Sequence, residues 1–157
     1  MGDETTCSVA ASGVVACWGC NDSGQRGDAD VTCSDAKAVV ALAEPAVQVS
    51  LGSNRGCAVL ASGAVACWGS NAWGALGDGV AHHATCPRTA IAWDCSPAAV
   101  RVRGLDDAAE VAVSEDHVCA RRHSGQVVCW GMNTYGQLGE ARARTVRCPR
   151  PSWTSTA

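Results

Sequence analysis

The sequence lacks phenylalanine and has only one tyrosine and one lysine among its 157 residues. Any core must therefore be built from alanine, valine, leucine, the six tryptophans and the 11 cysteines, which supply little apolar area per residue. The single lysine and a net charge of −3 exclude the basic surface that nucleic acid binding requires. We predict no nucleic acid partner and interpret the arginines between positions 142 and 150 as solvated charge.

Long apolar runs are also missing. No stretch approaches the roughly 20 apolar residues that span a bilayer, so we expect no membrane span. The start of the chain, MGDETTC, has neither the basic residues nor the apolar run of a signal peptide. Cysteine is abundant instead, close to the level typical of small secreted disulfide scaffolds. This usage predicts an extracellular, periplasmic or cell-envelope protein.

Catalytic signatures are absent from the sequence. There is neither a glycine-rich phosphate loop nor a nucleophile elbow. The pair Asp106-Asp107 lies in a predicted turn, where turn chemistry explains it better than paired catalytic carboxylates. We predict that the chain is not an enzyme, with no catalytic residue and no cofactor.

Two cysteine patterns could suggest redox or metal chemistry. Cys17-Trp18-Gly19-Cys20 has Cys-x-x-Cys spacing but no thioredoxin-like βαβ context. His82 and His83 could join Cys86 and Cys95 as a zinc tetrad. Since a second Cys-x-x-Cys or a His-x3-His is missing, we prefer a disulfide-closed loop with exposed histidines and predict no metal.

One pattern occurs three times, at residues 7–27, 57–77 and 119–139. Each copy reads Cys, nine residues, Cys-Trp-Gly, one residue, Asn, two residues, Gly, two residues, Gly. Such self-similarity indicates a repeat architecture. We predict a single repeat segment over 1–157, with variable inserts at 28–37, 78–98 and 140–157 that tolerate differences in length.

Each copy begins with two short apolar runs around Ser-Gly, which predicts a β-hairpin. A three-residue loop with Gly13 in the left-handed conformation places Cys7 directly opposite Cys17, within reach of a disulfide. The same geometry predicts cross-strand disulfides for Cys57 with Cys67 and for Cys119 with Cys129. The alternative is three pairs of reduced, buried cysteines.

The remaining cysteines lie mostly in the inserts. We predict that Cys20 pairs with Cys33 and that Cys86 pairs with Cys95 in a small stapled loop. Cys148 lies nine residues before the last residue, Ala157, and is the candidate unpaired thiol.

The segment Trp-Gly-x-Asn-x-x-Gly predicts a glycine-rich turn after each hairpin, with the tryptophan in the core. Before the second glycine stand Ser23, Trp73 and Tyr135. Trp73 and Tyr135 are candidate partner-binding residues, because exposed aromatics anchor protein interfaces. The alternative is that both side chains lie back over the neighbouring repeat.

Alternating residues predict further strands at 47–51, 99–105 and 109–113, the last two joined by the turn 104–107. About four short strands per repeat is the content of one β-propeller blade. The predicted fold class is all-β, with antiparallel hairpins in about three blades of a partial or open propeller.

The residues from Trp130 to Gly139, WGMNTYGQLG, resemble the repeat of the regulator of chromosome condensation (RCC1) family, and the paired cysteines resemble its bacterial, cysteine-containing branch. The family's histidine before the first cysteine is kept only as His117, with Thr5 and Arg55 elsewhere. Arg26 replaces the turn leucine, and Ser114 replaces a strand-end glycine. The resemblance implies a ring of about seven blades, so the chain would need further blades, self-association or a partner to cover its edges.

A repeated frame that carries variable, partly aromatic turn residues favours a non-enzymatic protein-interaction module. The partner's identity does not follow from the sequence, because family members differ in task. The alternatives are a structural surface-array piece or a fragment of a larger secreted repeat protein with no activity of its own. A third reading is part of an enzyme whose catalytic residues lie outside this chain.

Overall fold

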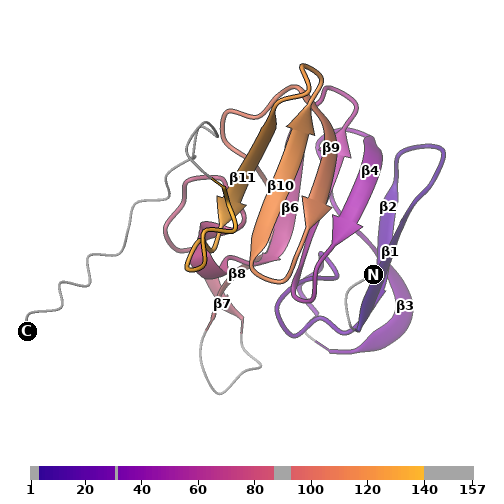
Figure 1. The fold of residues 1–157 in the computed structure, drawn as a ribbon. Helices are drawn as coiled ribbons and strands as arrows, with labels where there is room; N and C mark the ends of the chain where they lie inside the picture. The colour runs from indigo at the N-terminus through magenta and orange to yellow at the C-terminus, as the bar shows by residue number, and fades with distance from the viewer. Residues whose placement is uncertain (1–3, 31, 87–92, 140–157) are drawn as a thin grey trace, which may run out of the picture.

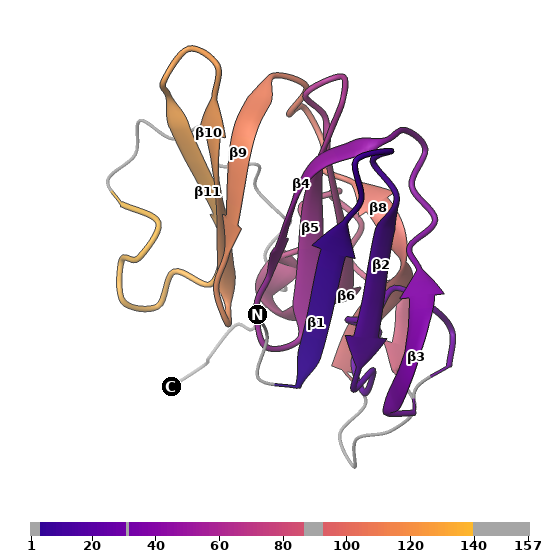
Figure 2. The same cartoon turned by 90° about the vertical axis from the view of Figure 1, so that its right-hand side faces the viewer.

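A computed structural model of the chain describes residues 4–30, 32–86 and 93–139. Over these residues the protein is built from antiparallel strands and one short 3-10 helix. The strands form three sheets that stand side by side, each packed through its face on the next (Figures 1 and 2). The prediction of an all-β fold of about three blades with cross-strand disulfides is confirmed. The insert 140–157, with Cys148, lies outside the described residues.

Blade 1 has the strand order β1-β2-β3 and consists of β1 (Thr5–Val9), β2 (Val15–Gly19) and β3 (Ser34–Val39). Blade 2 has the order β4-β5-β6-β8-β7 and consists of β4 (Ala46–Leu51), β5 (Arg55–Leu60), β6 (Val65–Ser70), the 3-10 helix η1 (Ala72–Gly74), β7 (Ala84–Cys86) and β8 (Trp93–Arg101). Blade 3 has the order β9-β10-β11 and consists of β9 (Ala108–Val113), β10 (His117–Arg122) and β11 (Val127–Gly131).

The strand predicted at 99–105 differs from the structure at both ends. β8 begins already at Trp93, and it ends at Arg101 because the chain then turns through Gly104, which has φ +72°. β8 pairs with β6 in blade 2, whereas β9 pairs with β10 in blade 3. The predicted turn at 104–107 therefore carries the chain from one blade to the next. The middle blade has five strands where about four were expected, because the insert 78–98 supplies β7.

The three central hairpins have one geometry. Cys7 faces Cys17, Cys57 faces Cys67 and Cys119 faces Cys129 in the antiparallel register. Each pair is joined by a disulfide. At the hairpin tip Ala10 N–H donates to the Val14 carbonyl (2.9 Å), which leaves a three-residue loop with Gly13 at φ +82°. Glycine fits this left-handed position without the steric cost of a side chain.

The cores lie between the blades. Between blades 1 and 2, valines, alanines and Cys17 pack around Trp68. Between blades 2 and 3, Cys57, Cys67, Leu76 and small apolar residues pack around Trp130. The disulfide of Cys7 and Cys17 therefore packs against blade 2, and the disulfide of Cys57 and Cys67 packs against blade 3. Large aromatic wedges compensate for the small side chains of the strands.

The two indole N–H groups tie neighbouring blades together. Trp68 Nε1 donates to the Gln25 carbonyl of blade 1 (2.8 Å), and Trp130 Nε1 donates to the Ala75 carbonyl of blade 2 (2.9 Å). Gln25 and Ala75 hold the same place in the repeat. The wedge of one blade is therefore bonded to the turn of the blade before it.

The strands β4 and β9 lie beside each other, and they are bridged by side chains. The Gln48 amide donates to the Val111 carbonyl (2.9 Å) and accepts the Val111 N–H (2.8 Å). Blade 1 has no counterpart of these strands among the described residues, so β1 is paired only with β2. An open hollow of about 360 Å³ lies along the free edge of β1, between Cys7 and Val49.

Among residues 4–30, 32–86 and 93–139, no helix has the length and apolar character needed to cross a membrane.

Candidate functional site

The candidate site is the set of turns that follow β2, β6 and β11, at residues 21–27, 71–77 and 133–139. Each begins with an asparagine whose carbonyl accepts the N–H of a glycine three residues on, at 2.9–3.3 Å. A second such bond joins that glycine's carbonyl to the next glycine N–H, at 3.0 Å in all three turns. Both glycines have positive φ, which explains their fixed spacing in the repeat.

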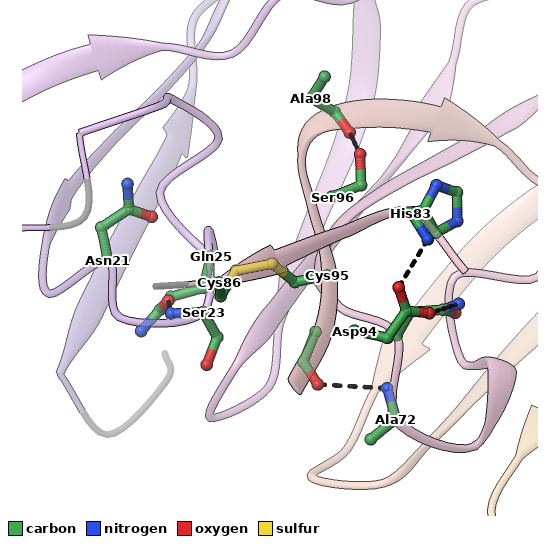
Figure 3. Close-up of a disulfide and its surroundings, with 12 residues drawn as sticks. Asn21, Ser23, Gln25, Ala72, His83, Cys86, Asp94, Cys95, Ser96 and Ala98 are labelled. Atoms are coloured by element: carbon green, nitrogen blue, oxygen red, sulfur yellow. Dashed lines mark hydrogen bonds between the residues drawn. A yellow bond between two sulfur atoms is a disulfide. The ribbon is translucent and has the colours of Figure 1, made fainter. Parts of the chain in front are cut away.

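The asparagine side chain closes each turn. Its Oδ1 accepts the N–H of the residue five positions later, at 2.7 Å for Asn21, 3.1 Å for Asn71 and 3.1 Å for Asn133. In blade 2 the Asn71 Nδ2 also donates to the Asp94 carboxylate (2.7 Å). The same carboxylate accepts the His83 backbone N–H (2.6 Å; Figure 3). The asparagines therefore fix the shape of the turn surface.

Two of the three turns have a glutamine that holds the variable residue. The Gln25 Oε1 accepts the Ser23 N–H (2.8 Å), and the Gln137 Oε1 accepts the Tyr135 N–H (2.9 Å). Ala75 stands at this place in the middle turn and has no side-chain acceptor to offer. There the variable residue Trp73 has φ +63°, the only positive φ outside glycine in the described residues.

Trp73 is 62% exposed and Tyr135 is 87% exposed. The value for Trp73 is the more telling one, because the blades on both sides of it are present. Its indole does not lie back over a neighbouring repeat, which was the alternative considered from the sequence. A bulky residue in the left-handed conformation is costly, and such strain gathers at functional sites.

The turn of blade 1 is filled differently from the others. Arg26, at the position of the buried Leu76, is itself buried and donates to the Asp28 carboxylate (2.9 Å) and to the Thr32 and Asp30 carbonyls. The departure from leucine is thus accommodated by an ion pair and by carbonyls of the first insert. The first turn therefore keeps the hydrogen bonds of the other two turns. Its tip residue is the small Ser23.

The other two disulfides stabilise the rims of the blades. Cys20 is joined to Cys33, and Cys86 is joined to Cys95 across β7 and β8. The register places Cys95 opposite Ser70, which stands where Cys20 stands in blade 1. Cys33 and Cys95 are therefore equivalent, 62 residues apart, but they have different partners. The sequence Cys-Ser, which both inserts contain, was a signal of this equivalence.

The insert disulfide of blade 2 lies beside the turn of blade 1. Figure 3 shows Ser23 and Gln25 next to the bond between Cys86 and Cys95. A Cβ built on Gly24 would lie 2.9 Å from the Pro97 Cα, so this glycine allows the turn to contact β8 closely. The turn surface and the insert therefore form one continuous region.

The residues considered for metal, redox or acid chemistry have other roles here. The thiols of Cys86 and Cys95 are bonded to each other, and His83 Nε2 lies 3.2 Å from the Asp78 carboxylate. In the described part of the chain no three His, Cys, Asp or Glu side chains gather as a metal site would require. Cys17 and Cys20 each have a separate disulfide partner.

The acidic pair in the turn after β8 forms ion pairs. Asp106 accepts from Arg101 at 2.7 Å and Asp107 accepts from Arg122 at 2.6 Å. The Arg101–Asp106 pair is largely exposed and contributes little to stability, whereas the Arg122 side chain is only 24% exposed. Each carboxylate is paired with a different arginine. The two aspartates therefore do not face a shared site, as a pair of catalytic carboxylates would.

In the first two hairpins, the residue two positions before the first cysteine bonds its strand to the segment that leads into the following turn. Thr5 Oγ1 donates to the Cys20 carbonyl (2.6 Å), and Arg55 Nε donates to the equivalent Ser70 carbonyl (3.0 Å). In the third copy His117 Nδ1 lies 2.7 Å from the Ser114 hydroxyl instead. Burial lowers the pKa of Arg55 to about 10, while the charge of Asp116 opposes this shift.

Packed antiparallel sheets of three, five and three described strands, with a tryptophan wedge and a bonded turn at each junction, have the arrangement of β-propeller blades. The repeat model for the regulator of chromosome condensation (RCC1) matches residues 46–74 and 108–137. These two segments of the chain are therefore RCC1 repeats, as the resemblance of the turn motif indicated. No curated protein matches the sequence.

Solved structures of RCC1-like proteins share the fold. Human WBSCR16 superposes with a TM-score of 0.68 at 18% identity, covering 83% of this chain and 31% of that one. Yeast RCC1 (Prp20), solved bound to Kap60, gives 0.71 at 18% identity and covers 85% and 31%. Prp20p from Saccharomyces cerevisiae, whose structure was described together with its binding to Gsp1p and histones, gives 0.67 at 21% identity and covers 88% and 33%. The chain spans about a third of the length of these structures.

Proposed function

We propose that this chain is a non-enzymatic protein-interaction module whose turn surface binds a protein partner. The observation that carries the proposal is Trp73, which is 62% exposed and strained although both neighbouring blades are present. An exposed aromatic on a rigid turn can anchor a partner at low entropic cost. Tyr135 extends the same surface on blade 3.

The scaffold suits such a role. Asparagine and glycine bonds hold each turn in one shape, while the tip residue changes from Ser23 to Trp73 to Tyr135. Yeast RCC1 (Prp20), which shares the fold, binds protein partners: it was solved bound to Kap60 and described with its binding to Gsp1p and histones. The likeness to these structures extends to the fold alone, so their partners are not carried over to this chain. We propose instead a protein partner from the compartment in which this chain is found.

We place that compartment outside the cytosol, at the cell envelope, in the periplasm or in the extracellular space. The five disulfides among the described residues are consistent with an oxidising environment. They also support the assignment to the bacterial, cysteine-containing branch of the family. A cytosolic small GTPase is therefore not the partner we expect.

The test is capture of partners from envelope extract and culture fluid by the immobilised, disulfide-intact chain. We compare wild type with Trp73→Ala combined with Tyr135→Ala, and with Val39→Ala, which truncates an equally exposed residue outside the turns. Loss of partners only in the aromatic double variant supports the proposal. An unchanged set of captured proteins in that variant would refute it.

The second candidate is a segment of a larger secreted repeat protein, with a structural role in that assembly. The chain's coverage of about a third of the matched structures favours this candidate. It predicts that Trp73→Ala combined with Tyr135→Ala leaves the set of captured proteins unchanged. Substitutions on the outer faces of blades 1 and 3, where further blades would pack, should instead reduce capture.

A further inference from the structure

The two outer blades each have one face that no described residue covers. On blade 1 this face carries Val14, Ala16 and Trp18. Their counterparts on blade 2 are Ala64, Ala66 and Trp68, which are buried against blade 1. Val14, by contrast, is 46% exposed. Blade 1 thus presents the tryptophan face of a blade junction without the blade that would precede it.

Blade 3 presents the opposite half of the same junction. Its uncovered face carries Val127, the disulfide of Cys129, and Leu138 of the turn. The counterparts of these residues on blade 2 are Val65, Cys67 and Leu76, all of them buried against blade 3. Val127 is 51% exposed where Val65 is 0% exposed. Blade 3 therefore has the apolar residues that form a junction in blade 2, but on a face that is exposed to solvent.

One hydrogen bond marks each junction in the chain. The indole of Trp68 is bonded to the Gln25 carbonyl, and the indole of Trp130 is bonded to the Ala75 carbonyl. In the repeat the third donor is Trp18, and the third acceptor is the carbonyl of Gln137. Among the described residues neither group has a hydrogen-bond partner, so the described part of the chain carries an unused donor and acceptor at opposite ends of the row of blades.

We propose that the tryptophan face of blade 1 docks on the uncovered face of blade 3 of a second copy of this chain. In this head-to-tail contact the Trp18 N–H of one copy donates to the Gln137 carbonyl of the other. The proposed contact repeats the junctions already seen between blades 1 and 2 and between blades 2 and 3. Since it is heterologous, it can close into a ring or continue along a row of copies.

Charged residues make this contact weaker than the junctions inside the chain. The Lys37 ammonium lies 5.0 Å from the centre of the Trp18 ring, where blade 2 has Ala99. On the other face Arg121 and Glu110 form an exposed ion pair (3.2 Å) in place of Val59 and Gln48. Covering these groups costs desolvation, so the association is expected to be reversible and concentration-dependent.

Sedimentation velocity of the disulfide-intact chain over a wide concentration range tests the proposal. Wild type is expected to self-associate. Trp18→Ala or Leu138→Arg should each weaken self-association by about thirtyfold or more, the scale of a lost tryptophan anchor. Near-ultraviolet circular dichroism verifies that each variant is folded, and Val127→Arg replaces Leu138→Arg if that variant is not.

Mixing the two variants gives the sharper test. Trp18→Ala keeps the blade 3 face and Leu138→Arg keeps the blade 1 face, so an equimolar mixture should form a heterodimer that neither variant forms alone. Trp73→Ala is the matched control, because Trp73 belongs to the middle blade, and it should associate like wild type. The same control distinguishes this contact from the turn-surface proposal, which requires Trp73.

Three outcomes would overturn the head-to-tail contact. Wild type could remain monomeric at its highest soluble concentration, Trp18→Ala could associate as strongly as wild type, or the mixture of variants could stay monomeric. A further repeat segment that binds the wild-type chain but not Trp18→Ala, while wild type alone stays monomeric, would show that the face is used by another chain instead.

Discussion

The middle blade and the outer blades carry the same motif but differ in what surrounds it. Val65 and Trp68 of blade 2 are fully buried, because blade 3 covers one face of the sheet and blade 1 covers the other. Val127 of blade 3 corresponds to Val65, and Trp18 of blade 1 corresponds to Trp68, but each of these two lies on a face that no described residue covers. The same residue in the same local structure therefore contributes to the core in one copy and to the surface in another.

This difference follows from how repeat proteins are stabilised. Each blade contacts only its neighbours, so the free energy of folding is roughly a sum of blade and junction contributions. Blade 2 takes part in two junctions and each outer blade in one. Substitutions at equivalent positions should thus have unequal effects, and each of the following predictions tests one such inequality at a concentration where the chain is monomeric.

The largest difference is expected at the tryptophan wedges. Trp68→Ala should lower the free energy of unfolding by about 3–5 kcal/mol, because it removes a buried side chain and leaves a cavity. It also leaves the Gln25 carbonyl without its donor. Trp18→Ala should cost about 1 kcal/mol or less. Guanidinium unfolding without reductant measures both, and equal losses would contradict the blade-junction account.

Disulfide removal should have a smaller, two-part effect. All three hairpin disulfides close loops with a sequence separation of 10 residues, so the chain-entropy contribution is about the same, slightly under 3 kcal/mol. Replacing Cys57 and Cys67 by alanine also empties space in the core between blades 2 and 3. We expect this double variant to lose more stability than the alanine pair at Cys119 and Cys129.

The measurement is the same unfolding experiment on the two double variants. An equal loss in both would mean that loop closure alone accounts for the disulfides. A larger loss at Cys119 and Cys129 would contradict the assignment of blade 3 to the uncovered end.

At the valines the contrast isolates apolar burial. Val65→Ala should destabilise by about 2 kcal/mol through lost transfer free energy and a small cavity. Val127→Ala, at a residue 51% exposed, should change stability by less than about 0.5 kcal/mol. Thermal or denaturant unfolding of the two variants measures the ratio of their losses in free energy of unfolding. If a second copy covers blade 3 at higher concentration, the two losses should become more similar.

The smallest effect concerns the backbone at the turn tips, where the sign should reverse. At Trp73, which has φ +63°, glycine should be more stable than alanine by about 1 kcal/mol. At Tyr135 alanine should be the more stable, because that residue has no positive φ. Comparing Trp73→Gly with Trp73→Ala, and the same two variants at Tyr135, cancels the loss of each aromatic side chain. The same sign at both sites would show that the middle turn is not strained.

Much of the local structure could be predicted from the sequence. The Ser-Gly tips and the opposed cysteines defined the hairpins, since register and turn chemistry are local. The disulfides of Cys20 with Cys33 and of Cys86 with Cys95 were also predicted. The equivalence of Cys33 and Cys95 was not, because the separation of 50 residues between the first two copies conceals the separation of 62 between these two cysteines. The role of Gln25 and Gln137 in holding the turn tip was also missed, because it depends on backbone geometry that the pattern does not display.

The sequence by itself determined the hairpins, the turns and the RCC1 type of the repeat, because these depend on residues close together in the chain. The tertiary structure decided which copies are core and which are surface. It also decided that Trp73 stays exposed between two blades, and that Trp18 and Gln137 remain a donor and an acceptor without partners among the described residues. The physical reason is that burial is a property of neighbours: a blade's own residues shape its faces, but only the adjacent blade removes them from water.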